Sequence, residues 1–249
     1  MRTFVLILAC IFLCTCKKGH EFDCFKSAGS ITTQSYELEE FTSLKVSNKI
    51  NLELVYTSAK PRIEITYNKN LISGIQREII DKELIIDDNN RCNWVRNYNL
   101  QPKIRVFYTY DLQTITAIGA AKIFNTDTLK LNKITINNLS VEDVELTIFD
   151  VNGIECNGFN SGGFKIKGQA GYLTCTIDDA SYIDTRNLTV DDLYIFHYSI
   201  RSSYIQSRDI MQAKLYGLGD VYINAAPSDT TRWRCCKVLL ERFGSGEFK

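Results

Sequence analysis

Short runs in which apolar and polar residues alternate make up most of the chain. In the run Arg62–Tyr67 the apolar side chains fall at Ile63, Ile65 and Tyr67, and Lys103–Tyr110 alternates in the same way. Successive side chains of a β-strand point to opposite faces, so this alternation predicts strands with one buried face. No long run has the spacing of an amphipathic helix. The pattern therefore predicts an all-β protein.

A second regularity has a much longer period. Apolar residues recur at separations of 19 or 20 residues, and a second apolar column lies two residues after the first. Apolar columns that keep one phase over several periods are typical of repeat proteins, in which each unit buries its apolar face only against its neighbours. The first column is Ile115, Ile134, Ile154, Leu173, Leu193 and Ala213, and the second is Ala117, Ile136, Cys156, Cys175, Ile195 and Leu215.

This period predicts the architecture. Three short strands and their turns use about 20 residues, so one period makes one coil, and stacked coils lie about 4.8 Å apart. We expect a right-handed parallel β-helix, that is, a three-sided β-solenoid with 19–20 residues per coil. Its repeat coils occupy residues 113–249, with an excursion at 225–237 where the phase is lost. Residues 30–112 are expected to form an N-terminal, strand-rich part of the same solenoid.

The N-terminus predicts export. Residues 1–15 contain one charged residue, Arg2, and an apolar run that is too short to span a bilayer but suits a signal peptide. The following Leu13-Cys14-Thr15-Cys16 resembles the lipobox of bacterial lipoproteins, which implies cleavage before Cys16 and a lipid on its thiol. Cleavage without lipidation is the alternative. We expect a signal peptide at 1–15, a lipidated tether at 16–29, and attachment to the membrane only through that lipid.

The predicted signal peptide and lipid anchor suggest a role for most of the nine cysteines. Two leave with the signal peptide and Cys16 carries the lipid, which leaves six in a compartment that permits disulfides. Cys24 and Cys92 flank the first strand-rich region and are predicted to form a disulfide. Cys156 and Cys175 share one apolar column and are predicted to be buried free thiols. The pairing of Cys235 and Cys236 stays open.

Composition and charge argue against several classes of function. The chain has 29 basic and 29 acidic residues, so no excess of positive charge exists to neutralise nucleic-acid phosphates. Two His residues leave little material for histidine catalysis. No spacing of Cys and His suits a structural zinc site. We therefore expect no nucleic-acid partner, no metal and no cofactor.

Several motifs together resemble a known family. They are Asp23-Cys24-Phe25-Lys26-Ser27, then Val46–Asn51, then Arg91–Arg96, followed by degenerate Gly-rich corners. Over roughly residues 22–249 the chain resembles the putative auto-transporter adhesin, head GIN domain family. The resemblance implies an exported, often lipid-anchored β-helix protein of Gram-negative envelopes, here expected at the outer membrane. Lys49 replaces the Gly of the family's GIN triplet, and some corners have lost their glycines.

Candidate chemistry is sparse. The acidic pair Asp178-Asp179 and Arg201 would meet at one corner and suit an enzyme acting on polysaccharides, but Asp is also a common turn residue. His197 is expected to be a hydrogen-bonded residue at a strand end. We therefore predict no catalytic residue. Tyrosines recur in consecutive coils and form a candidate ligand face, although Tyr also simply covers β-sheets. These tyrosines are Tyr194, Tyr198, Tyr204, Tyr216 and Tyr222.

The sequence thus favours a non-enzymatic cell-envelope lipoprotein that presents a rigid face to a glycan or protein ligand. One alternative is a carbohydrate-active β-helix enzyme, and another is a purely structural envelope protein.

Overall fold

The computed structural model describes residues 27–90, 101–224 and 237–249. In these residues the secondary structure is β except for one short 3-10 turn, η1 (Ile72–Gly74), so the prediction of an all-β protein is confirmed. None of the described segments is a helix with the length and apolarity needed to cross a membrane. The signal peptide, Cys16, Cys24, Cys92, Cys235, Cys236 and residues 225–236 of the predicted excursion lie outside the described residues.

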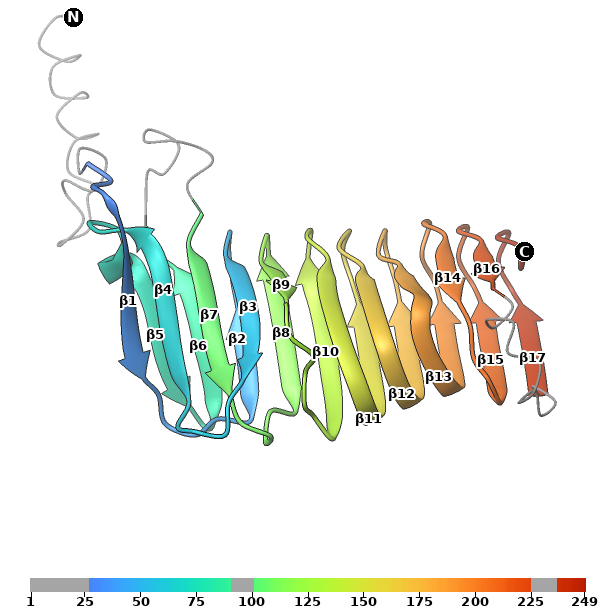
Figure 1. Ribbon diagram of the computed structural model, residues 1–249. Coiled ribbons are helices and arrows are strands. Elements are labelled where there is room, and N and C mark those ends of the chain that lie inside the picture. The colour runs from blue at the N-terminus through green and yellow to red at the C-terminus, as the bar shows by residue number, and fades with distance from the viewer. Residues whose placement is uncertain (1–26, 91–100, 225–236) are drawn as a thin grey trace, which may run out of the picture.

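The strands lie side by side in one extended array (Figure 1). The N-terminal strands are β1 (Ile31–Glu37), β2 (Ser43–Val46), β3 (Asn51–Tyr56), β4 (Arg62–Asn68), β5 (Ile75–Ile80), β6 (Glu83–Asp88) and β7 (Lys103–Tyr108). The later strands are β8 (Thr114–Gly119), β9 (Lys122–Phe124), β10 (Lys133–Ser140), β11 (Val144–Gly158), β12 (Phe164–Ile177), β13 (Ile183–His197), β14 (Ser203–Ile205), β15 (Ile210–Leu215), β16 (Val221–Ile223) and β17 (Lys237–Arg242).

From β8 to β17 the pairings are parallel, and from β10 to β13 they follow the predicted columns. Ile134 pairs with Ile154, Ile154 with Leu173, and Leu173 with Leu193. All four side chains are buried. The alternating pattern within each strand therefore places equivalent apolar residues of successive chain passages above one another, as the repeat predicted.

The ends of the first predicted column are wrong by two residues. Ile115 pairs with Ile136 rather than Ile134, and Ala213 pairs with Ile195 rather than Leu193. The interval between paired residues is therefore 21 at the start of the array and 18 near its end. A two-residue slip keeps every apolar side chain on the inner face, because side chains alternate with period two. The turns between strands absorb the difference in length.

The N-terminal part is built differently. β4 pairs antiparallel with both β1 and β7, and β5 pairs antiparallel with β6. The β5–β6 hairpin turns at Asp81 and Lys82, which both have positive φ (50° and 64°), as a type I′ turn requires. β2 and β3 pair in parallel with β8 and β9, and so join this part to the parallel array. The 20-residue period does not extend into these antiparallel strands.

Most buried side chains are apolar, and successive corners lie close together. Cys156 and Cys175 are neighbours in register and both are buried free thiols, as predicted; burial raises the pKa of Cys175. At the corner after β15, a Cβ on Gly219 would lie 2.1 Å from the Arg201 carbonyl oxygen of the preceding corner. Only glycine allows the two corners to approach this closely.

Candidate binding surfaces

Equivalent positions at the corners hold aromatic side chains. The backbone N–H of Tyr198, after β13, donates to Ile177, that of Tyr216, after β15, to His197, and that of Phe243, after β17, to Leu215. The rings form a stack: the Tyr198 and Tyr216 centroids lie 4.6 Å apart at 9°, and those of Tyr216 and Phe243 lie 4.8 Å apart at 8°. Phe243 ends the stack and is 63% exposed.

Further apolar side chains extend this stack into a surface. Two residues beyond Tyr198 and Tyr216, at the tips of the same corners, Ile200 and Leu218 are each more than 60% exposed. Phe159 follows β11 at the position equivalent to that of Tyr198 after β13, since its N–H donates to Asn138, and it is also exposed. Asp178 interrupts the series between them. We call the set the corner row: Phe159, Tyr198, Ile200, Tyr216, Leu218 and Phe243.

A second aromatic pair lies on the outer face of β14 and β16. Tyr204 and Tyr222 are in register and stack at 4.9 Å and 17°. The Arg186 guanidinium lies 4.4 Å from the Tyr204 ring centroid, and Lys249 Nζ lies 5.6 Å from that of Tyr222. Cations therefore sit against the ends of this pair, and both outer ring faces are already covered.

The five tyrosines singled out in the sequence are thus divided among three rows. Tyr198 and Tyr216 stack at the corners and Tyr204 and Tyr222 stack on the next strand segment, whereas Tyr194 lies on the outer face of β13 between Thr174 and Gln212. Sequence reasoning missed Phe243 because it considered only tyrosines in consecutive predicted coils. The Gly244-Ser245-Gly246 corner that follows Phe243 is the signal that identifies it.

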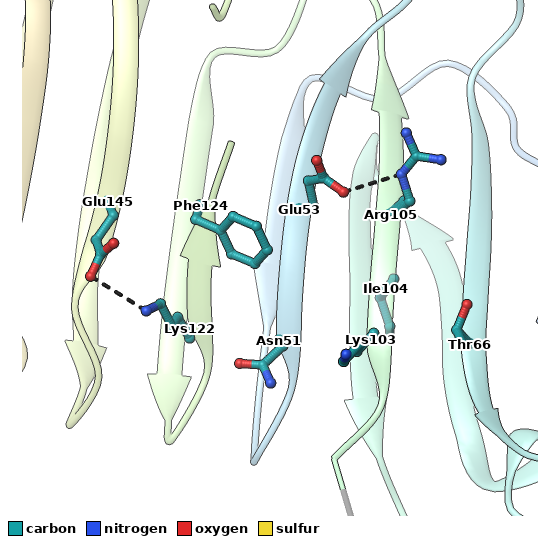
Figure 2. Close-up of a pocket in the computed structure, with 9 residues that line it drawn as sticks. All are labelled: Asn51, Glu53, Thr66, Lys103, Ile104, Arg105, Lys122, Phe124 and Glu145. Atoms are coloured by element: carbon teal, nitrogen blue, oxygen red, sulfur yellow. Dashed lines mark hydrogen bonds and ion pairs between the residues drawn. The ribbon is translucent and has the colours of Figure 1, made fainter. Parts of the chain in front are cut away.

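A groove of about 480 Å³ opens on the outer face where β3, β7 and β9 meet (Figure 2). Two ion pairs cross it: Glu53 Oε2 lies 3.1 Å from Arg105 Nε, and Glu145 Oε1 lies 3.4 Å from Lys122 Nζ. Both pairs are partly exposed, so each adds little stability. The groove is lined by Asn51, Glu53, Thr66, Lys103, Ile104, Arg105, Lys122, Phe124 and Glu145.

The groove belongs to one outward row of in-register residues. Sequence reasoning missed it because outward side chains form no apolar column. The alternating charges of Glu145, Lys165 and Asp184, at separations of 20 and 19 residues, are the signal that could have shown it. The whole row, from β3 to β16, is Glu53, Phe124, Glu145, Lys165, Asp184, Tyr204 and Tyr222.

Asp143 lies beside this row and holds the side chain of Lys165 in an ion pair. Its carboxylate lies 2.7 Å from Lys165 Nζ and accepts hydrogen bonds from the Tyr182 hydroxyl at 2.7 Å and the Gly163 N–H at 2.9 Å. Burial disfavours the charged carboxylate, but these three donors outweigh burial and lower the pKa of Asp143. The carboxylate and the Lys165 ammonium are therefore held as a fixed ion pair at neutral pH.

The predicted acidic corner is occupied by turn hydrogen bonds. The Asp178 carboxylate accepts the Asp179 N–H at 2.7 Å, and that of Asp179 accepts the Asn160 N–H at 3.1 Å. Arg201 donates to the Ser161 carbonyl at 3.0 Å and lies over the Tyr182 ring. These side chains hold successive corners together, which is the structural role that Asp often has in turns.

His197 ends β13 as a buried, hydrogen-bonded residue, in agreement with its prediction. Its Nε2 lies 3.0 Å from Ser203 Oγ, which also accepts the Ile183 N–H at 3.2 Å. Burial lowers the pKa of His197 from its usual 6.5 to about 4. The imidazole is therefore neutral at pH 7.

Comparison with protein families identifies one match. The model of the family described as putative auto-transporter adhesin, head GIN domain, matches residues 40–227, which is more than half of the chain. A search of curated proteins found no match.

Solved structures share the fold at low sequence identity. A putative adhesin from Bacteroides fragilis is 16% identical with a TM-score of 0.71, over 88% of this chain and 96% of that one. A putative adhesin from Parabacteroides distasonis is 15% identical with a TM-score of 0.62, over 89% and 98%. A putative lipid binding protein from the same species is 16% identical with a TM-score of 0.58, over 89% and 97%.

Proposed function

Because the chain belongs to the putative auto-transporter adhesin, head GIN domain family, we propose that it is an adhesin that binds a glycan or protein partner through the corner row. The exposed aromatic stack of Tyr198, Tyr216 and Phe243 is the observation that carries this proposal. Adjacent exposed apolar side chains at Ile200 and Leu218 enlarge the surface. Contiguous aromatic and aliphatic patches of this kind are typical of binding interfaces.

The strand array serves this role as a rigid support. We propose that it winds as a right-handed, three-sided β-solenoid, which the parallel in-register pairs from β8 to β17 support. Register between neighbouring strands fixes the spacing of the corner side chains. The aromatic rings are therefore ordered before a partner arrives, and binding costs less conformational entropy.

Attachment to the envelope is the second part of the proposal. The family name points to an exported or cell-surface protein, and the lipobox-like sequence before Cys16 supports an outer-membrane lipoprotein. Replacing Cys16 by Ser and fractionating cells tests the anchor: the variant should leave the membrane fraction, and unchanged retention contradicts lipidation. Non-reducing peptide mapping tests the Cys24–Cys92 disulfide, which free thiols at both positions would refute.

We also propose that the protein is not an enzyme. The carboxylates of Asp178 and Asp179 are engaged in turn hydrogen bonds, which supports a structural role for the acidic corner. Incubation with acidic polysaccharides, with and without Ca²⁺, should leave chain length unchanged. Robust depolymerisation would establish the enzyme alternative.

The adhesin proposal is tested by binding of the mature protein, with Cys16 replaced by Ser, to epithelial cells. Phe243→Ala should weaken binding about fivefold or more, because it removes the exposed ring at the end of the stack. Tyr222→Ala is the matched control, since Lys249 and Tyr204 cover the faces of that ring, and it should bind like the parent protein.

Treatment of the cells separates the two partner classes. Periodate oxidation should abolish binding to a glycan, and protease treatment should abolish binding to a protein. No binding by the parent protein, or equal losses in Phe243→Ala and Tyr222→Ala, would overturn the proposed role of the corner row.

A further inference from the structure

We infer that the groove lined by Phe124 and Lys103 binds a carboxylated sugar residue, such as a uronic acid, within an acidic glycan. This site is separate from the corner row and shares with the proposed function only the premise that the protein meets glycans outside the cell. The inference joins three features of the groove: a lysine with no carboxylate partner in the described part of the chain, an aromatic ring that points outward, and polar groups that include both hydrogen-bond donors and acceptors.

Among the residues that the structure describes, the ion pairs of the groove leave Lys103 without a carboxylate partner. Arg105 is paired with Glu53 at 3.1 Å and with Glu64 at 3.2 Å, and Lys122 is paired with Glu145. Both glutamates that line the groove are thus neutralised by the protein itself. Among the described residues, no carboxylate lies within ion-pair distance of Lys103, which is exposed at the start of β7. An anionic group on the ligand would complete this set of charges.

The aromatic ring supplies the second feature. Phe124 occupies an outward position of β9 between Glu53 and Glu145 in the row, where a charged residue is the rule on neighbouring strands. In Figure 2 its ring projects from β9 toward β3 and forms part of the groove wall. An aromatic face offers an apolar surface to the C–H face of a pyranose ring, while the sugar's hydroxyl groups remain free for polar contacts.

Polar groups for those hydroxyls lie beside the ring. In Figure 2 Asn51 lies between Lys122 and Lys103, and its amide already donates to Gln101 Oε1 at 2.7 Å, which fixes its orientation. Glu53 also accepts a hydrogen bond from Thr126 Oγ1 at 2.6 Å and is held in place. Carboxylate acceptors and ammonium or amide donors together match a hydroxyl, which both donates and accepts.

The dimensions agree with a small ligand. A volume of about 480 Å³ falls within the range of about 300–1,000 Å³ found for small-molecule sites. The side chains that form the groove come from β3, β4, β7, β9 and β11, which are held in register by backbone pairing. The groove is therefore formed before any ligand binds.

Calorimetric titration with a trigalacturonate, on the mature protein with Cys16 replaced by Ser, tests the inference. The fully methyl-esterified trimer is the matched ligand control, because it keeps the sugar rings and loses the negative charges. The acid should bind and the ester should bind about two- to fivefold more weakly, as expected for an exposed charge pair. Raising the salt concentration should weaken binding of the acid only.

Variants locate the binding site. Lys103→Gln should weaken binding of the acid about two- to fivefold and leave that of the ester unchanged. Phe124→Ala should weaken binding of both ligands severalfold. Lys167→Gln removes an exposed lysine of β12 outside the groove and should bind like the parent protein. Thermal melting of each variant verifies that it is folded.

Three results would overturn the inference: equal affinity for acid and ester, no effect of Lys103→Gln in a folded protein, or binding of anionic phospholipid vesicles but not of trigalacturonate. Failure here leaves the cell-binding role of the corner row standing, because that test uses Phe243 and does not involve the groove. Conversely, a negative result in the cell-binding test would not affect the titration with trigalacturonate, which depends only on the groove.

Discussion

Replacing His197 by Leu should make the protein markedly less sensitive to mild acid. His197 is fully buried, and its column neighbours in register are Ile177 and Leu215. A leucine therefore suits the apolar column on both sides. Ser203 loses one hydrogen-bond partner but keeps the Ile183 N–H, so the variant should fold.

The magnitude follows from the pKa of His197. Burial lowers this pKa from 6.5 to about 4, so between these values the unfolded chain binds a proton that the folded protein does not. The free energy of unfolding therefore falls as the pH falls from about 6.5 toward 4. Between pH 7.5 and 4.5 the loss is about 2.5 kcal/mol, at about 1.4 kcal/mol for each pH unit.

Urea denaturation at pH 7.5 and 4.5, followed by circular dichroism, measures this loss. The parent protein should lose about 2.5 kcal/mol more than His197→Leu, which amounts to a midpoint shift of about 1 M urea. Carboxylates with lowered pKa values, such as those of Asp143 and Asp184, act below pH 4. Burial raises the pKa of Asp88, but this carboxyl is present in both proteins, so the difference between them reports the histidine. Equal acid sensitivity in both proteins would refute the buried, neutral state of His197.

Two further changes test individual contacts. Asp143→Asn should lower the free energy of unfolding at pH 7 by about 1 kcal/mol, because it removes the negative charge that contacts Lys165 and Tyr182. The difference from the parent protein should vanish as the pH falls through the depressed pKa of Asp143, below 3.8. Glu145 is a more exposed partner of Lys165, so Glu145→Gln is the control and should change the free energy of unfolding by less than about 0.5 kcal/mol. A larger loss of stability in Glu145→Gln than in Asp143→Asn would contradict this prediction. Gly219→Ala should destabilise by about 2 kcal/mol, because its Cβ would clash with the Arg201 carbonyl oxygen, and an unchanged melting temperature would show that the corners are not packed this closely.

The sequence predicted the inner columns well because burial constrains them. Ile134, Ile154, Leu173 and Leu193 had to be apolar and in phase, so their alignment could be read directly. At Ile115 and Ala213 the columns still looked regular, but the true register differs by two residues. An alternating pattern looks the same after a shift of two, and only the lengths of the turns distinguish the two registers.

The outer surface was harder to predict for the opposite reason. Exposed residues tolerate many side chains, so neither the groove at Phe124 nor the end of the stack at Phe243 left an apolar column. The antiparallel hairpin of β5 and β6 was also missed, since its turn residues, Asp81-Lys82, lack the Asn-Gly or Asp-Gly signal that marks most type I′ turns.

The stacking of successive chain passages is the claim on which the other conclusions depend, and distances between spin labels test it most directly. One label is introduced as an unnatural amino acid at Thr114 and the second at Tyr194, Gln212 or Leu239. Following the in-register pairs from strand to strand, these positions lie four, five and six strands from Thr114 in one outward row. The stacked arrangement predicts distances that rise evenly, by about 4.8 Å at each step, to about 29 Å. Distances that stay constant or fall along this series would contradict it.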